Sequence, residues 1–284
     1  MNRITIKNNV KIISNNDTSY VIKEKKNNLD DTYKYLLSRS FDYFPMILSI
    51  NDKYYVYEYI EDIVEPMEQK ITDMIYLLIL LHSKTTFYKE VDIDYYKNIY
   101  EEINKKIDDI YLYYEELLNN IDSIIYMSPS NYLIARNSSL IYSMINYAKY
   151  NLDKWYSLVE NKRKVRMVNI HNNLKLDHYL KSRDKSYFIS WDNSRIDMPI
   201  YDIISLYKNN YLNFDFSELF NIYLSKYPLH EDEMLLLFVI LSIPKKIEYN
   251  KSEYLNVVNI RKYLDYIYKT SDLLSKYSKE EEAK

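Results

Sequence analysis

The sequence predicts an α+β fold with two lobes, a small N-terminal lobe of five strands and one helix and a larger lobe that is mainly helical. Short segments rich in β-branched residues dominate the chain up to residue 60. After Pro66, apolar residues recur at spacings of three and four, which is the period of an amphipathic helix. A length of 284 residues is also long for a single hydrophobic core and suits two lobes.

The small lobe is recognised by alternating or clustered apolar residues between asparagine-rich turns. Its strands are expected at 3–7, 10–14, 20–25, 46–50 and 53–60. Between the third and fourth strands, residues 29–40 change to helical spacing, with one apolar face made of Leu29, Tyr33, Leu36 and Leu37. The order is therefore three strands, one helix and two strands.

The boundary between the lobes is expected just after the fifth strand. Residues 1–62 would form the small lobe, and its last six residues, 57–62, would form a hinge. The second lobe, residues 63–284, would open with a helix at 67–84 that ends near His82.

Residues 92–162 are predicted to form a helical hairpin of two long helices, at 92–120 and 129–161. Ser128 can cap the second helix, and Pro129 suits its first turn. A hairpin of this kind either contacts a substrate or partner or serves only as a packed helical pair.

The C-terminal part, from Asp197 to Lys284, is predicted to be helical throughout. Its segment 231–243 is hydrophobic nearly all round, as a central core helix is. The longest apolar runs, 74–81 and 234–241, fall far short of the ~20 residues that span a bilayer. We therefore expect no membrane span.

Composition excludes several classes of function. The net charge is −3, and no tract of Lys and Arg with interleaved aromatic residues is present, so nucleic acid is not an expected partner. The absence of cysteine excludes disulfides and thiolate metal sites. The N-terminus lacks the apolar segment of a signal peptide, and a cytoplasmic location is expected.

The chain contains no glycine. This excludes the Walker P-loop, the Rossmann fingerprint, the nucleophile elbow and the glycine-rich loop of kinases, which all need glycine for close approach or tight turns. Turns must instead use Asn and Asp, which tolerate left-handed backbone better than other residues. Asn8-Asn9, Asn15-Asn16-Asp17 and Asn193-Ser194 suit that role.

Residues 169–202 carry the most specific pattern, NIHNNLKLDHYL followed by a short hairpin and ISWDNSRIDMPIYDI. The segment resembles the catalytic core of aminoglycoside phosphotransferase-like kinases, a protein-kinase-like family that includes choline kinase relatives and spore coat proteins of the CotS type. In that family a His-x-Asp opens the catalytic loop, an Asn follows five residues after the Asp, and a second Asp begins the metal-binding segment. Here His171 is retained, but the three working positions are Asn173, His178 and Ser190.

The resemblance therefore implies a kinase-like scaffold with degraded catalytic motifs. Phosphoryl transfer depends on positioning and on charge neutralisation through Mg²⁺, which prefers carboxylate and phosphate oxygens. An Asn173 side chain cannot accept a proton, Ser190 offers a neutral hydroxyl, and His178 offers a nitrogen. In an alternative interpretation, a metal site survives but is displaced to Asp192, a position where active members of the family often have a second acidic residue. On a strand, Asp192 and Ser190 would face the same way.

Two further residues are assigned through the resemblance. Lys23, on the third strand, stands where kinases place the lysine that contacts the nucleotide phosphates. Its usual Glu partner is missing from 29–40, and Asp30 or Asp31 is the nearest substitute, although acids there also suit a helix N-terminus. Asp202, in the family's Pro-x-x-Asp segment, is expected to be structural and to tie its helix to the catalytic loop.

The leading interpretation is a catalytically degraded kinase-fold protein with a binding or structural role, in a bacterial spore coat or a similar assembly. Its partner would be a protein, and no cofactor is assigned to it. The alternative is an active phosphotransferase that uses ATP and Mg²⁺ on a small hydroxylated or amine-bearing molecule. A third interpretation is a regulator that binds nucleotide without turnover.

Overall fold

The computed structural model describes residues 3–7, 10–14 and 18–282, so the turns predicted at Asn8-Asn9 and Asn15-Asn16-Asp17 lie outside the described residues. The chain forms two compact units. The first contains the N-terminal part through Phe87 together with Arg166–Asn210 and Ile222–Tyr227. The second contains Tyr88–Val165, Tyr211–Asn221 and the chain from Pro228 onward. Neither unit is a continuous stretch of sequence.

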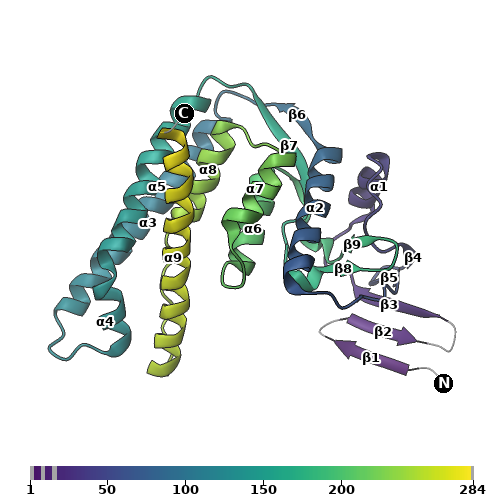
Figure 1. Ribbon diagram of the computed structural model, residues 1–284, viewed down its shortest axis with the longest axis horizontal. Helices are drawn as coiled ribbons and strands as arrows, with labels where there is room; N and C mark the ends of the chain where they lie inside the picture. Colours follow the sequence, from purple (N-terminus) through teal and green to yellow (C-terminus); the bar gives the residue numbers. More distant parts are fainter. Residues whose placement is uncertain (1–2, 8–9, 15–17, 283–284) are drawn as a thin grey trace. The chain divides into compact units, whose positions relative to one another are not determined.

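The first unit contains the predicted five-stranded antiparallel sheet and its helix (Figure 1). The elements are β1 (Arg3–Lys7), β2 (Val10–Ser14), β3 (Ser19–Glu24), α1 (Asp30–Ser38), β4 (Ile47–Ile50) and β5 (Tyr54–Glu58). Their order in the sheet is β1-β2-β3-β5-β4, so β3 lies in the middle. Tyr33 and Leu36 of α1 are buried, as the helical spacing predicts, but Leu37, expected on the same face, is exposed. The Leu29 N–H donates to the Tyr55 hydroxyl at 2.9 Å.

The rest of the first unit surrounds a loop that follows a buried strand. The elements are α2 (Met67–Thr85), β7 (Lys164–Ile170), η1 (Leu176–His178), β8 (Tyr179–Lys181), β9 (Ser186–Phe188), η2 (Trp191–Asn193), β10 (Arg195–Asp197) and α6 (Ile200–Asn210). β8 and β9 form the short predicted hairpin. β7 pairs with β10, which places the loop after Ile170 beside the segment that ends the hairpin.

The second unit is built mainly from long helices. Its helices include α3 (Tyr95–Asp122), α4 (Pro129–Arg136), α5 (Ser138–Val159), α8 (Glu231–Ser242) and α9 (Glu253–Glu282). α5 packs against both α3 and α8, and α4 packs against α9. Two further elements, β6 (Phe87–Glu90) and α7 (Phe216–Lys226), lie where the chain passes between the units.

Two predictions about helices are wrong in detail. The single helix expected at 129–161 is two helices, because Asn137 leaves helical geometry and its side-chain amide donates to the Leu133 carbonyl at 2.7 Å. The chain from Asp197 onward is not helical throughout, since Asp197 ends β10 and pairs with Val168. From residue 200 to 282, however, the described chain contains no strand. None of the described helices is both long enough and apolar enough to cross a membrane.

Candidate functional site

The loop after β7 is held by one buried carboxylate. Asp202, in the first turn of α6, accepts the His171 N–H on Oδ2 at 2.9 Å and the Asn172 N–H on Oδ1 at 2.6 Å. Its Oδ2 also lies 3.1 Å from Nε2 of the buried His82. Asp202 therefore joins α6, α2 and the loop, which is the geometry expected of a residue that ties its helix to the loop.

His171 is completely buried. Its Nε2 donates to the Ile189 carbonyl at 2.9 Å, and its ring lies 4.7 Å from the Trp191 ring. Burial lowers the pKa of His171 to about 4, so the imidazole is neutral at pH 7. Nδ1 has no hydrogen-bond partner among the described residues. The retained histidine thus links the loop to the segment before η2.

Asn173, His178 and Ser190 differ in their contacts. His178 uses Nδ1–H to donate to the Asn173 carbonyl at 2.7 Å, which closes the loop on itself. Ser190 has a φ of 67°, a left-handed conformation that costs a non-glycine residue roughly 1 kcal/mol. Of these three residues, only Ser190 lines the cavity described below.

The prediction that Ser190 and Asp192 face the same way on a strand is wrong. The left-handed backbone at Ser190 ends the extended segment, and Trp191–Asn193 forms a turn of 3-10 helix. This turn directs the Asp192 carboxylate to the Lys23 ammonium on β3, and the two groups form an ion pair. Their side chains are only 13% and 19% exposed, respectively. The Asp192 carbonyl also accepts from the Asn27 amide at 2.7 Å.

The acids of α1 are not the partners of Lys23, which corrects a second prediction. Asp30 accepts from the Tyr55 hydroxyl at 3.1 Å, so it is bound to β5. Asp31 is 96% exposed and lies 4.0 Å from Lys34 on its own helix. Both acids lie in the first turn of α1, where they also favour the positive end of the helix dipole.

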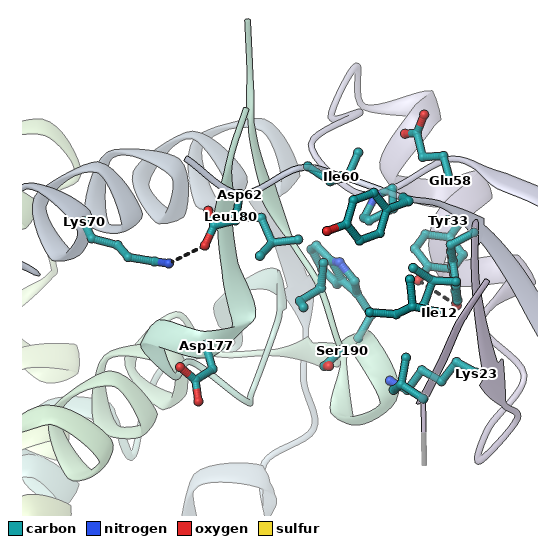
Figure 2. Close-up of a pocket in the computed structure, with 17 residues that line it drawn as sticks. Ile12, Lys23, Tyr33, Glu58, Ile60, Asp62, Lys70, Asp177, Leu180 and Ser190 are labelled. Carbon is teal, nitrogen blue, oxygen red and sulfur yellow. Dashed lines mark hydrogen bonds and ion pairs between the residues drawn. The ribbon is translucent and has the colours of Figure 1, made fainter. Parts of the chain in front are cut away.

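A cavity of about 400 Å³ opens in the first unit (Figure 2). Val10, Ile12 and Val21 line it from the sheet, and Leu180 and Ile189 line it from the hairpin segment. These aliphatic side chains form apolar walls that suit a flat, weakly polar group. Sequence reasoning does not identify these five residues as a site, because their alternation equally indicates half-buried strands.

The polar lining of the cavity divides into two groups. Lys23 and Ser190 form one group, near the Asp192 ion pair. Lys70 and Asp62 form the other group. The Lys70 ammonium lies 3.0 Å from Asp62 of the linker between β5 and α2, as the dashed line in Figure 2 marks. Asp62 also accepts the Lys181 N–H at 2.8 Å. The linker is thus fixed to α2 and to β8 at Asp62.

Few groups in the cavity could hold a metal ion. In the described ranges, no three His, Asp or Glu side chains are arranged to hold one. Asp177 lines the cavity, and Asp192 is occupied by Lys23. A magnesium ion bound with a nucleotide would therefore take most of its oxygen ligands from phosphates and water.

Solved structures reveal the fold, although no protein-family model and no curated protein sequence matches the chain. An aminoglycoside phosphotransferase from Alicyclobacillus acidocaldarius superposes with a TM-score of 0.71 at 10% identity, over 96% of this chain and 92% of that protein. The chain has the protein-kinase-like fold of the aminoglycoside phosphotransferases. Spectinomycin phosphotransferase, in complex with ADP and spectinomycin, shares this phosphotransferase fold with a TM-score of 0.54 at 12% identity, over 95% and 93% of the two chains.

A choline kinase from Streptococcus pneumoniae is also similar, with 18% identity, coverage of 96% and 92%, and a TM-score of 0.49. The phosphotransferase fold places the small antiparallel sheet in the N-terminal lobe and most helices in the C-terminal lobe, as predicted. Within the first unit, Lys23 forms the ion pair with Asp192 and lines the cavity together with Ser190.

Proposed function

We propose that this chain is a catalytically degraded phosphotransferase-fold protein whose cavity binds a nucleotide without transferring its phosphate. The observation that carries the proposal is the ion pair of Lys23 with Asp192 beside Ser190. Asp192 is the acid on which a displaced metal site would depend, and Lys23 already neutralises it. To bind Mg²⁺, Asp192 would have to exchange a largely buried ion pair for the metal, which weakens metal binding.

The replaced positions support the loss of chemistry. Phosphoryl transfer needs a group that accepts or orients the proton of the attacking hydroxyl, and it needs carboxylates for Mg²⁺. Asn173 supplies an amide, and Ser190 supplies a hydroxyl. His178 is oriented by its bond to the Asn173 carbonyl, so it presents a nitrogen where the family has an amide oxygen.

The cavity supports a nucleotide as the bound ligand. Its aliphatic walls suit an aromatic base, and its volume of about 400 Å³ is within the range of ligand pockets. Among the described residues, the backbone groups of Tyr59–Glu61 make no hydrogen bond, so they can pair with the polar edge of a base. Spectinomycin phosphotransferase, which has the same fold, is known in complex with ADP.

We also propose that the protein is a component of a larger protein assembly. The resemblance of residues 169–202 to spore coat proteins of the CotS type supports an assembly such as a bacterial spore coat. In this proposal the protein is made in the cytoplasm and then joins the assembly. The second candidate is an active phosphotransferase for a small molecule, and it is favoured by Lys23, which lines the cavity from the strand where kinases place their phosphate-contacting lysine.

The test is the shift in melting temperature with ATP, measured with Mg²⁺ and with EDTA. A ligand at a hundred times its Kd stabilises the folded state by about 2.7 kcal/mol. We expect ATP to raise the melting temperature equally with Mg²⁺ and with EDTA. Lys23→Ala should leave this increase nearly unchanged, and neither protein should hydrolyse ATP. Lys34→Ala, which removes an exposed lysine of α1, is the matched control.

Two results would contradict the proposal. A shift that requires Mg²⁺ and is lost in Lys23→Ala, together with ATP hydrolysis abolished by Asp192→Ala, would establish an active enzyme. If neither ATP nor ADP changes the melting temperature in either condition, the cavity is not a nucleotide site.

A further inference from the structure

A second cavity, of about 380 Å³, lies in the second unit between the α8–α9 connection and the N-terminal half of α9. Both helices are labelled in Figure 1. Six of the residues that line it carry the inference: Tyr211, Lys245, Lys246, Glu248, Lys262 and Tyr263. None of them takes part in the nucleotide cavity.

The lining carries an excess of positive charge, from three lysines and one glutamate. Within the part of the chain that the structure describes, none of these three lysines has a carboxylate within 4.0 Å. Other lysines of the same unit are paired, such as Lys149 with Asp108 at 2.7 Å and Lys162 with Asp232 at 3.0 Å. Ammonium groups that outnumber the carboxylates in a concave surface raise the local concentration of anions.

Two of the ammonium groups are held in place. The Lys245 Nζ lies 5.5 Å from the centroid of the Tyr263 ring, and the Lys246 Nζ lies 5.4 Å from that of Tyr113. The backbone beneath them is fixed as well, because the Tyr114 hydroxyl donates to the Lys245 carbonyl at 2.8 Å. Side chains that are already positioned lose less conformational freedom when a ligand binds.

The opposite wall comes from α9. Lys262 is on this helix, and its carbonyl accepts from the Tyr211 hydroxyl at 2.9 Å. Ile260 and Tyr263, which also line the cavity, are buried. The cavity therefore combines exposed ammonium groups with a floor of buried, partly apolar side chains.

We propose that this cavity is a binding site for a small phosphorylated anion. An ammonium group is a compact charge that binds phosphate oxygens well, and three of them suit a group with several negative charges. The volume is within the range of small-molecule sites, so the phosphate can carry an organic part. Glu248, which also lines the cavity, can accept a hydrogen bond from a hydroxyl of that organic part.

The test is calorimetric titration of the full chain with inorganic pyrophosphate, at constant ionic strength and with EDTA present. We expect binding that is weakened about tenfold in Lys262→Gln, since a charged hydrogen bond is lost. Lys251→Gln, in the same α8–α9 connection but outside the lining, should change the affinity less than about twofold. Lys23→Gln should also leave it unchanged.

Three results would overturn the inference. These are no binding of pyrophosphate, equal weakening in Lys262→Gln and Lys251→Gln, or binding lost only in Lys23→Gln, which would place the anion in the nucleotide cavity. Sedimentation with phosphatidylcholine vesicles that contain phosphatidic acid distinguishes two sources of the phosphate. Vesicle binding that Lys262→Gln abolishes would assign a lipid headgroup, whereas pyrophosphate binding without vesicle binding would assign a soluble ligand.

Discussion

His171 is held in the loop by contacts that do not depend on catalysis. Its ring contacts Trp191 and Phe188, its backbone N–H reaches Asp202, and its Nε2 reaches the Ile189 carbonyl. These contacts stabilise the loop whether or not a phosphate is transferred. The retention of His171 beside Asn173 is therefore explained by packing and hydrogen bonding.

The buried His171 predicts a pH dependence of stability. Its pKa is lowered from 6.5 to about 4 in the folded protein, so the unfolded chain binds a proton more readily between those values. This stability is complete above pH 6.5 and is lost as the pH falls toward 4, by roughly 3 kcal/mol. Denaturant unfolding between pH 7 and 4.5 should show a smaller decrease in His171→Asn than in the parent.

The control for this measurement is His230→Asn, because His230 is exposed and Asn also suits its position at the N-terminus of α8. Its pH dependence should match that of the parent. An unchanged slope in His171→Asn would show that other groups cause the acid sensitivity.

Short elements show where sequence prediction reaches its limit. The five strands and α1 were predicted nearly to their ends, because alternation and helical spacing are local signals. β10 has only three residues and exists because Arg195–Asp197 pairs with β7, so its cause lies elsewhere in the chain. The break at Asn137 was missed because the apolar spacing continues across it, and only the side-chain bond to Leu133 reveals it.

The ion pair between β3 and η2 predicts that substitutions at two aspartates change the free energy of unfolding by very different amounts. Asp192→Asn leaves the Lys23 ammonium largely buried without a counter-charge and should lower the free energy of unfolding by about 2 kcal/mol. Asp31→Asn breaks an exposed pair on α1 and should change it by less than about 0.5 kcal/mol. Urea unfolding at pH 7 measures both, and equal effects would mean that the Lys23–Asp192 pair contributes nothing beyond a surface pair.

At the scale of the whole molecule, the order of elements was enough to predict the fold, and the site was predicted only in part. The pattern in 169–202 singled out the loop residues as candidates. It could not show that Asp192 meets Lys23, because that contact depends on the left-handed Ser190 and joins residues 169 positions apart. Nor could it identify the aliphatic walls, which have the same pattern as any half-buried sheet.

Restoring the family pattern tests whether the fold still accommodates catalysis. The variant combines Asn173→Asp, His178→Asn and Ser190→Asp, and it should fold, because Asp tolerates the left-handed backbone at position 190. The two new carboxylates would repel each other, so Mg²⁺ should bind and neutralise them. ATP should then raise the melting temperature more with Mg²⁺ than with EDTA.

His178→Asn alone is the control, because it removes the bond to the Asn173 carbonyl without adding charge. It should show no dependence on Mg²⁺. If the folded triple variant shows none either, carboxylates at positions 173 and 190 are not sufficient for Mg²⁺ binding.

The interleaving of the two units has a consequence for synthesis on the ribosome. The sheet that carries Lys23 emerges early, but its partner Asp192 follows 169 residues later, roughly 10 to 30 s afterwards at about 5–20 residues per second. During that interval the nascent N-terminal lobe lacks the chain segments that complete its unit, and Lys23 has no counter-charge from Asp192. The first unit can close only after Tyr227 has been translated, so its folding waits for most of the chain.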